Sequence, residues 1–131
     1  MSRDWTSTGL AWLRILAGLG MATHGFAKVF GGGMEQMTQG VAALGFPLPS
    51  VFAWAAALSE FAGGLCLAAG IGTRFAAGFM FITMSVALFL AHAKDPFSKK
   101  ELAYLYWSVS GALVMLGGGA YTLPRLLGRR R

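Results

Sequence analysis

The sequence predicts an all-α integral membrane protein, a four-helix bundle with a short amphipathic interfacial helix between the first two spans. Only 12% of the 131 residues are charged, against about 25% in an average soluble domain. The mean hydropathy is +0.59. Four apolar runs each approach the roughly 20 residues that a helix needs to cross a bilayer. We therefore expect a single transmembrane domain over residues 1–131.

The first span is expected over residues 8–30. This run keeps Arg14, His24 and Lys28 within it and lacks a small-residue cleavage pattern, which favours a retained span over a removed signal peptide. The glycines at 31–33 should break the helix. Apolar residues then recur every three or four positions, which predicts a short amphipathic helix on the membrane surface over residues 34–45.

The remaining apolar runs predict spans over residues 51–69, 74–93 and 99–116. Ser50 is a candidate cap for the second span, in which Glu60 is the only charge. Ser98 and Glu101 have the S-x-x-E spacing of a capping box, which should open the fourth span. The polar segment between the last two spans is expected to be a loop.

The net charge of +6 lies largely in a basic tail over residues 124–131. No aromatic platform or recognition helix accompanies this tail, so we do not expect nucleic-acid binding. Four spans would place six lysine and arginine residues on the side of the termini and four on the other side. The six are Arg3, Arg74, Arg125, Arg129, Arg130 and Arg131, and the four are Lys28, Lys94, Lys99 and Lys100. The positive-inside rule then predicts cytoplasmic termini.

Redox chemistry through thiols and metal binding are both unexpected. The single cysteine, Cys66, allows neither an internal disulfide nor a C-x-x-C pair, and we expect it to be a small core residue. A zinc site needs three or four converging ligands, and the chain has two histidines on different predicted spans.

Ionisable groups at membrane depth are costly and usually face the interior of a bundle. On the first span, helical spacing places one set of residues on a common face: Arg14, Gly18, Met21, Gly25 and Lys28. The second span has a stripe of small residues around one carboxylate: Ala53, Ala57, Glu60 and Gly64. Glu60 should therefore be buried against another helix. A rise of about 1.5 Å per residue favours Arg14 as its counter-ion, with His24 as the second choice.

A polar pocket is expected beneath the amphipathic segment, in the outer part of the membrane. Its lining should come from His24, Lys28, His92, Glu101 and Tyr104. The candidate ligand or proton-site residues are Glu60, Arg14, His24, His92, Glu101 and Tyr104. Structural alternatives stay open at this point. Arg14 and Glu60 could only fix helix register, Glu101 could be a cap, the histidines could bond carbonyls, and Lys28, Lys94 and Arg74 could be interface anchors.

An ordered set of motifs resembles the DoxX family of small bacterial membrane proteins, from about Leu10 to Gly119. The set is Arg14 in L-R-I-L, His24-Gly25-x-x-Lys28, Gly45-Phe46-Pro47-Leu48-Pro49, Glu60-x-x-Gly63-Gly64, Gly72-Thr73-Arg74, His92 and Glu101-x-x-Tyr104. The resemblance implies a four-helix bundle in the bacterial inner (plasma) membrane. It also implies an association with membrane redox complexes, including quinone-linked thiosulfate oxidation. Distant eukaryotic relatives behave as assembly factors.

Three functions follow from these observations. The leading hypothesis is a non-catalytic or co-catalytic subunit of a plasma-membrane redox assembly that binds a quinone or another small apolar ligand near the outer polar cluster. Its partners would be the lipid bilayer, a membrane or peripheral oxidoreductase and, as an option, a second copy of the chain. The second hypothesis is a scaffold or assembly factor without chemistry. The third is a small-solute carrier, for which four unbroken spans without a repeat are an unusual platform.

Overall fold

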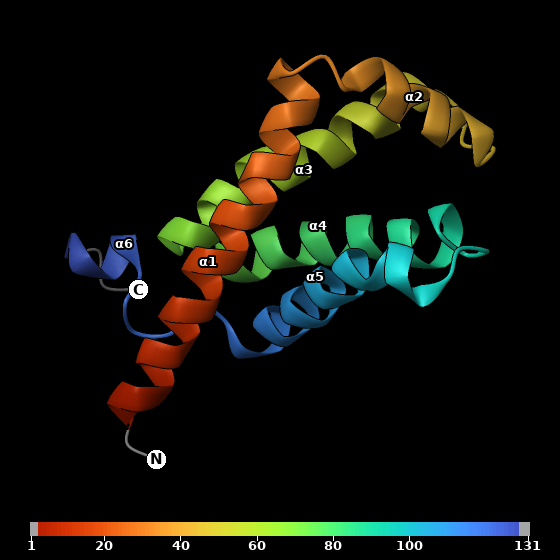
Figure 1. Cartoon of the computed structure of the whole chain (residues 1–131). Coiled ribbons are helices and arrows are strands. Elements are labelled where there is room, and N and C mark those ends of the chain that lie inside the picture. Colours follow the sequence, from red (N-terminus) through yellow and green to blue (C-terminus); the bar gives the residue numbers. More distant parts are fainter. Residues whose placement is uncertain (1–2, 129–131) are drawn as a thin grey trace.

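The computed structural model describes residues 3–128, and the regular structure within them is helical, so the all-α prediction is confirmed (Figure 1). The helices are α1 (Arg3–Phe30), α2 (Met34–Ala43), α3 (Pro49–Ala69), α4 (Thr73–Val86), the π-helical turn η1 (Ala87–Ala91), α5 (Phe97–Leu116) and α6 (Leu123–Leu126). In Figure 1, α2 and the turn between η1 and α5 lie at one end of the molecule, and α6 lies at the other.

Two predicted helix caps are wrong. Leu48 precedes α3 in the left-handed conformation (φ 48°), and Pro49 occupies the first turn, so Ser50 lies inside the helix. The helix α5 likewise begins after Pro96, and no side chain caps it. Ser98 and Glu101 therefore form no capping box. In both cases a proline lies ahead of the polar residue: Pro49 in the first turn of α3 and Pro96 directly before α5.

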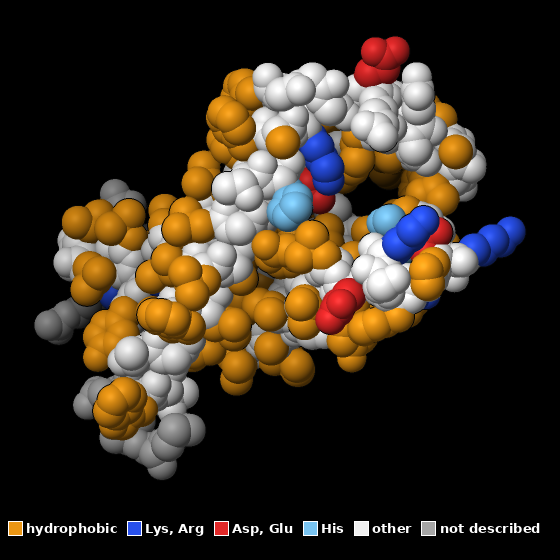
Figure 2. Space-filling view, in the orientation of Figure 1, with side chains coloured by type: hydrophobic (Ala, Val, Ile, Leu, Met, Phe, Trp, Pro, Cys, Tyr) orange, Lys and Arg blue, Asp and Glu red, His pale blue; other side chains and the backbone are white. Residues whose placement is uncertain are grey.

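Two of the helical segments have the length and apolar character of membrane spans. They are Pro49–Ala69 and Thr73–Ala91, with mean hydropathies of 1.6 and 1.8. The helices α1 and α5 have 28 and 20 residues but contain several charged side chains. Large hydrophobic side chains cover much of the outer surface (Figure 2). Such extensive exposed apolar surface is typical of a protein that contacts lipid.

Small residues bring α1 and α3 into close contact, as their sequence pattern predicts. A Cβ atom on Gly18 would lie 2.5 Å from the carbonyl oxygen of Gly64, and one on Gly64 would lie 2.6 Å from that of Gly18. Further along, Gly25 packs in the same way on the backbone of Phe61. These contacts set the register of the two helices. They place Lys28 level with Glu60, and they leave Arg14 near the end of α3.

The core lies between this helix pair and the pair formed by α4 and α5. Its fully buried side chains are Met21, Leu67, Ala77, Met80 and Leu113. Cys66 packs against this core as a free, half-buried thiol, as predicted. The helix α2 rests on α3 and buries none of its own residues. This arrangement leaves space under α2, between the two helix pairs.

Candidate functional site

A cavity of about 190 Å³ lies at the α2 end of the molecule, between α1 and α3 on one side and α4, η1 and α5 on the other. Figure 2 shows the molecule hollowed at this place, with basic, acidic and histidine side chains gathered around the opening. The lining residues are Met21, His24, Lys28, Glu60, Met84, Ala87, His92, Lys99, Leu102, Ala103 and Tyr106. Three of the five residues predicted to line a pocket beneath the amphipathic segment line this cavity together with Glu60: His24, Lys28 and His92.

The buried acid of the cavity is paired with a lysine. Glu60 is only 3% exposed. Its two carboxylate oxygens accept hydrogen bonds from the Lys28 Nζ at 2.8 and 2.7 Å. The predictions that Arg14 is the counter-ion and that Lys28 is an interface anchor are therefore wrong. The reason is the register of the two helices. The glycine contacts between α1 and α3 place Lys28 at the level of Glu60.

Arg14 is buried at the opposite end and binds backbone. Its guanidinium donates hydrogen bonds to the carbonyl oxygens of Gly118 and Tyr121, the latter at 2.8 Å, and approaches that of Ala68 at 3.5 Å. These contacts fasten α1 to the segment after α5 and to the end of α3. Arg14 therefore lies outside the cavity and acts there as a structural cross-link.

His92 lies where η1 meets the following turn. Its backbone N–H donates to the Ala87 carbonyl at 2.9 Å, the five-residue spacing of a π-turn, a feature often found at functional sites. Its Nδ1 lies 2.8 Å from Oδ2 of Asp95. This hydrogen bond holds the pKa of the Asp95 carboxyl below its ordinary value. Since Asp95 occupies Nδ1, Nε2 is the ring nitrogen left for a ligand.

The other histidine and a tyrosine are in ring contact at the wall of the cavity. His24 on α1 is exposed, and its ring meets the ring of Tyr106 edge-on, with centroids 6.1 Å apart. The Tyr106 hydroxyl makes no hydrogen bond to any residue of the described part of the chain. The hydroxyl lies next to Gly20 of α1, whose added Cβ would be in contact with it. The phenol and the imidazole both belong to residues that line the cavity.

Glu101 and Tyr104 do not line the cavity, although both were predicted to do so. Both are exposed on α5, and Tyr104 packs on neighbouring aromatic rings. At about 100° per residue, Tyr106 lies some 200° around the helix from Tyr104. A signal for the correct face was present in the sequence. Positions at helical spacing with small or apolar side chains mark it: Ala103, Tyr106, Ser110 and Leu113.

The cavity combines polar groups with apolar walls. Its volume of about 190 Å³ is below the roughly 300–1,000 Å³ of a drug-sized ligand site. It suits one small ring or a few water molecules. Ammonium, imidazole and phenol groups can donate hydrogen bonds to a carbonyl oxygen or exchange protons with it. Within residues 3–128, no three histidine, cysteine or acidic side chains gather in a way that could hold a metal ion.

Comparison with known proteins identifies the family of the chain. The DoxX family model matches residues 9–93, which include Lys28, Glu60 and His92. The chain is 33% identical to the inner membrane protein YqjF of Escherichia coli (strain K12), over 93% of this chain and 94% of that protein. No solved structure gives a significant match. On the family match and this full-length similarity, the chain belongs to the DoxX family.

Proposed function

We propose that the chain is a single-domain, four-helix protein of the bacterial inner membrane, with both termini in the cytoplasm. Besides the two most apolar helices, α1 and α5 would cross the bilayer. Their charges support this, because Lys28 and Arg14 form hydrogen bonds inside the protein and Lys99 and Lys100 lie in the first turn of α5. The relative named as an inner membrane protein supports the location.

Cysteine labelling tests this topology. In a Cys66→Ala background, cysteines introduced singly at Lys94 and at Gly128 should react from opposite sides of intact inner-membrane vesicles. Gly128 should react from the cytoplasmic side, since the basic tail follows it. Reaction of both positions from the same side would contradict four spans.

We further propose that the cavity binds the ring of a quinone or a similar small carbonyl compound, and that the protein serves a membrane redox assembly. The observation that carries this proposal is the joint lining by a buried ion pair, two imidazoles, a phenol and apolar side chains. Met21, Met84 and Leu102 would cover the faces of a ring. The donors would reach its carbonyl oxygens, and a partner oxidoreductase would supply the electrons.

Each polar residue has a distinct role in this proposal. Tyr106 and His24 donate hydrogen bonds to the ligand, because within residues 3–128 neither makes a hydrogen bond to another side chain. His92, oriented by Asp95, carries protons through its Nε2. The pair of Glu60 and Lys28 provides a fixed polar wall. Glu101, Tyr104 and Arg14 have no role in the binding.

The experiment compares two tyrosines that lie on different faces of one helix. Wild-type protein and variants are purified in mild detergent, bound quinone is extracted and quantified, and binding of a short-chain quinone is titrated. Tyr106→Phe should weaken binding by about 2- to 10-fold, the value of one lost hydrogen bond. The matched control Tyr104→Phe should bind as wild type does. His24→Ala and His92→Ala should weaken binding as well.

Protein that carries no quinone and shows no saturable binding would refute the ligand proposal. A second function, a scaffold or assembly factor, would then be favoured by one observation: Glu60 and Lys28 satisfy each other and need no ligand. In that case Glu60→Gln would lower protein level and partner recovery without changing any electron-transfer rate.

A further inference from the structure

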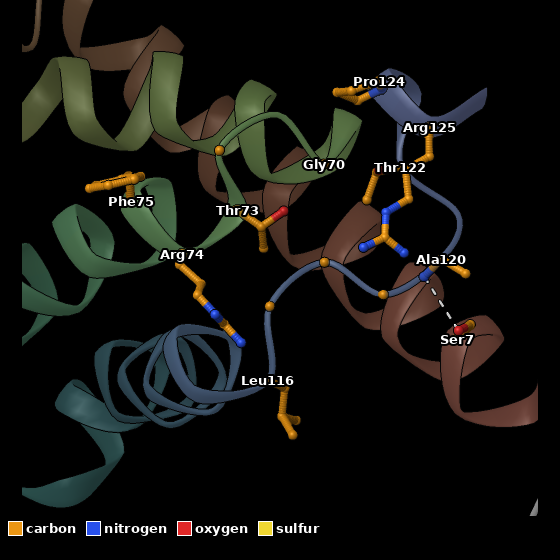
Figure 3. A pocket seen from close by; sticks show the side chains of 14 residues that line it. Ser7, Gly70, Thr73, Arg74, Phe75, Leu116, Ala120, Thr122, Pro124 and Arg125 are labelled. Carbon is orange, nitrogen blue, oxygen red and sulfur yellow. Dashed lines mark hydrogen bonds between the residues drawn. The ribbon is translucent and has the colours of Figure 1, made fainter. Parts of the chain in front are cut away.

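A second and larger pocket lies at the opposite end of the molecule. Its volume is about 540 Å³, and it is bounded by the start of α4, the glycine-rich segment after α5, and α6 (Figure 3). The residues that line it include Arg74 and Arg125 but no aspartate or glutamate. The proposed quinone cavity does not extend to it. The pocket is therefore positively charged.

Three guanidinium groups contribute to this charge. Figure 3 shows Arg74 and Arg125 on two sides of the pocket. Among the described residues the Arg125 side chain makes no hydrogen bond or ion pair, and the Arg74 side chain makes only one long contact, 3.4 Å to the Met115 carbonyl. Arg14 lies directly behind Gly70, whose added Cβ would be 3.1 Å from the Arg14 Cζ. Its partners are neutral carbonyls, so its positive charge is not cancelled.

An unpartnered hydroxyl points to the same place. Thr73 is 93% buried and its Oγ1 has no hydrogen-bond partner within residues 3–128. In Figure 3 this oxygen points to the side of the pocket on which Arg125 lies. Buried polar groups are rarely left unpaired, so this hydroxyl indicates a partner from outside the chain, such as a ligand or an ordered water. Thr73 also opens α4, where unpaired backbone N–H groups favour anions and no side chain caps the helix.

We infer that this pocket binds a phosphate group, carried either by a lipid headgroup or by a soluble phosphate. Guanidinium groups match the geometry of phosphate oxygens through paired hydrogen bonds, and a hydroxyl and helix N–H groups can complete the shell. The flank of the pocket favours a lipid. Phe75 lines it and is 80% exposed, which offers an apolar surface for an acyl chain.

Native mass spectrometry of the full chain in detergent tests the site. The probes are phosphatidylglycerol and a diacylglycerol with the same acyl chains, which lacks the phosphate. Wild type should retain phosphatidylglycerol and release diacylglycerol. Arg125→Gln should weaken phosphatidylglycerol binding about tenfold. The control Lys94→Gln, which removes the same charge from an exposed position at the other end, should have no effect.

Thr73→Val separates binding from folding. The hydroxyl has no partner to lose in the protein, so the variant should keep the wild-type melting temperature and yet bind phosphatidylglycerol about threefold more weakly. This variant decides the matter if Arg125→Gln fails to fold. Unchanged binding by Thr73→Val together with equal binding by Arg125→Gln and Lys94→Gln would overturn the site. Equal retention of the two lipids by wild type, with no displacement of phosphatidylglycerol by inorganic phosphate, would also overturn the site.

Inorganic phosphate distinguishes the two sources. If millimolar phosphate displaces phosphatidylglycerol from wild type but chloride at equal ionic strength does not, the pocket is a site for soluble phosphate. If phosphate leaves the lipid bound, the headgroup is the ligand. Both results support phosphate recognition, whereas equal displacement by chloride would reduce the pocket to a nonspecific cationic surface and overturn the inference.

Discussion

The two ends of the molecule satisfy a buried charge in different ways. At the α2 end, the acid Glu60 forms an ion pair with Lys28, and the pair has no net charge. At the other end, Arg14 donates hydrogen bonds to backbone carbonyls, which are neutral, so the site remains cationic. The ion pair therefore adds no net charge to the first cavity, which is also lined by Lys99, whereas the second pocket has arginines and no acid in its lining and is suited to an anion. The partner of a buried charge, and not its burial alone, determines what the adjoining space can accept.

Breaking the ion pair should have the largest effect. Lys28→Met leaves the Glu60 carboxylate buried and unpaired, which should lower the free energy of unfolding by about 4 kcal/mol. The double variant Lys28→Met/Glu60→Gln should recover most of that loss, since no unpaired charge remains. Unfolding in a detergent–SDS titration measures both. A double variant no better than the single one would mean that packing, and not charge, explains the loss.

Removing the buried guanidinium comes next. Arg14→Met strands the carbonyl acceptors of Gly118 and Tyr121, and hydrogen bonds to charged groups contribute about 1.5–3 kcal/mol each. Because methionine fills part of the space, we expect a net loss of about 3 kcal/mol in the same titration. Arg74→Met is the matched control, since Arg74 is exposed and makes one long contact. Equal losses in the two variants would contradict the cross-linking role of Arg14.

The helix contact that sets the register of the two ends should be the third in size. Gly18→Ala would place a Cβ 2.5 Å from the Gly64 carbonyl oxygen, and forced repacking costs about 1–3 kcal/mol. In the control Gly63→Ala, the nearest atom to the new Cβ would be 3.9 Å away. That change should be neutral or slightly stabilising, since alanine is the better helix former. If both variants were equally stable, the close approach of α1 and α3 would be wrong.

Sequence periodicity predicted the angular position of residues around these helices better than their position along them. It identified the stripes that carry Gly18 and Gly64, and it placed Glu60 in the interior. It paired Glu60 with Arg14 because the spans were aligned by their expected ends. The actual register follows from backbone contacts between particular glycines, which no single-helix pattern encodes. The face of α5 that lines the cavity was predicted wrongly for another reason. The prediction followed the polar residues Glu101 and Tyr104, whereas Tyr106 shares the helical spacing of the buried side chains.

The smallest effect should come from the exposed pair beside the first cavity, His92 with Asp95. Both side chains are about 40% exposed, so the pair should add little to global stability. The pKa of Asp95 lies below its ordinary value of 3.8, chiefly because of the His92 hydrogen bond, with smaller help from His92, Lys99 and Lys100 charge. A lowered carboxyl pKa stabilises the folded form above that value, and the effect is lost as the pH falls through the folded pKa.

A carboxyl-carbon NMR titration of detergent-solubilised protein measures this directly. The Asp95 midpoint should lie below 3.8 in wild type and should rise toward that value in His92→Ala. Lys99→Ala should raise it less, because the lysine acts only through charge. A larger rise in Lys99→Ala than in His92→Ala would mean that the hydrogen bond does not orient the ring. The exposed pair would then be unable to fix the His92 nitrogen that faces a ligand, and the cavity would lose one of its two proposed imidazole partners.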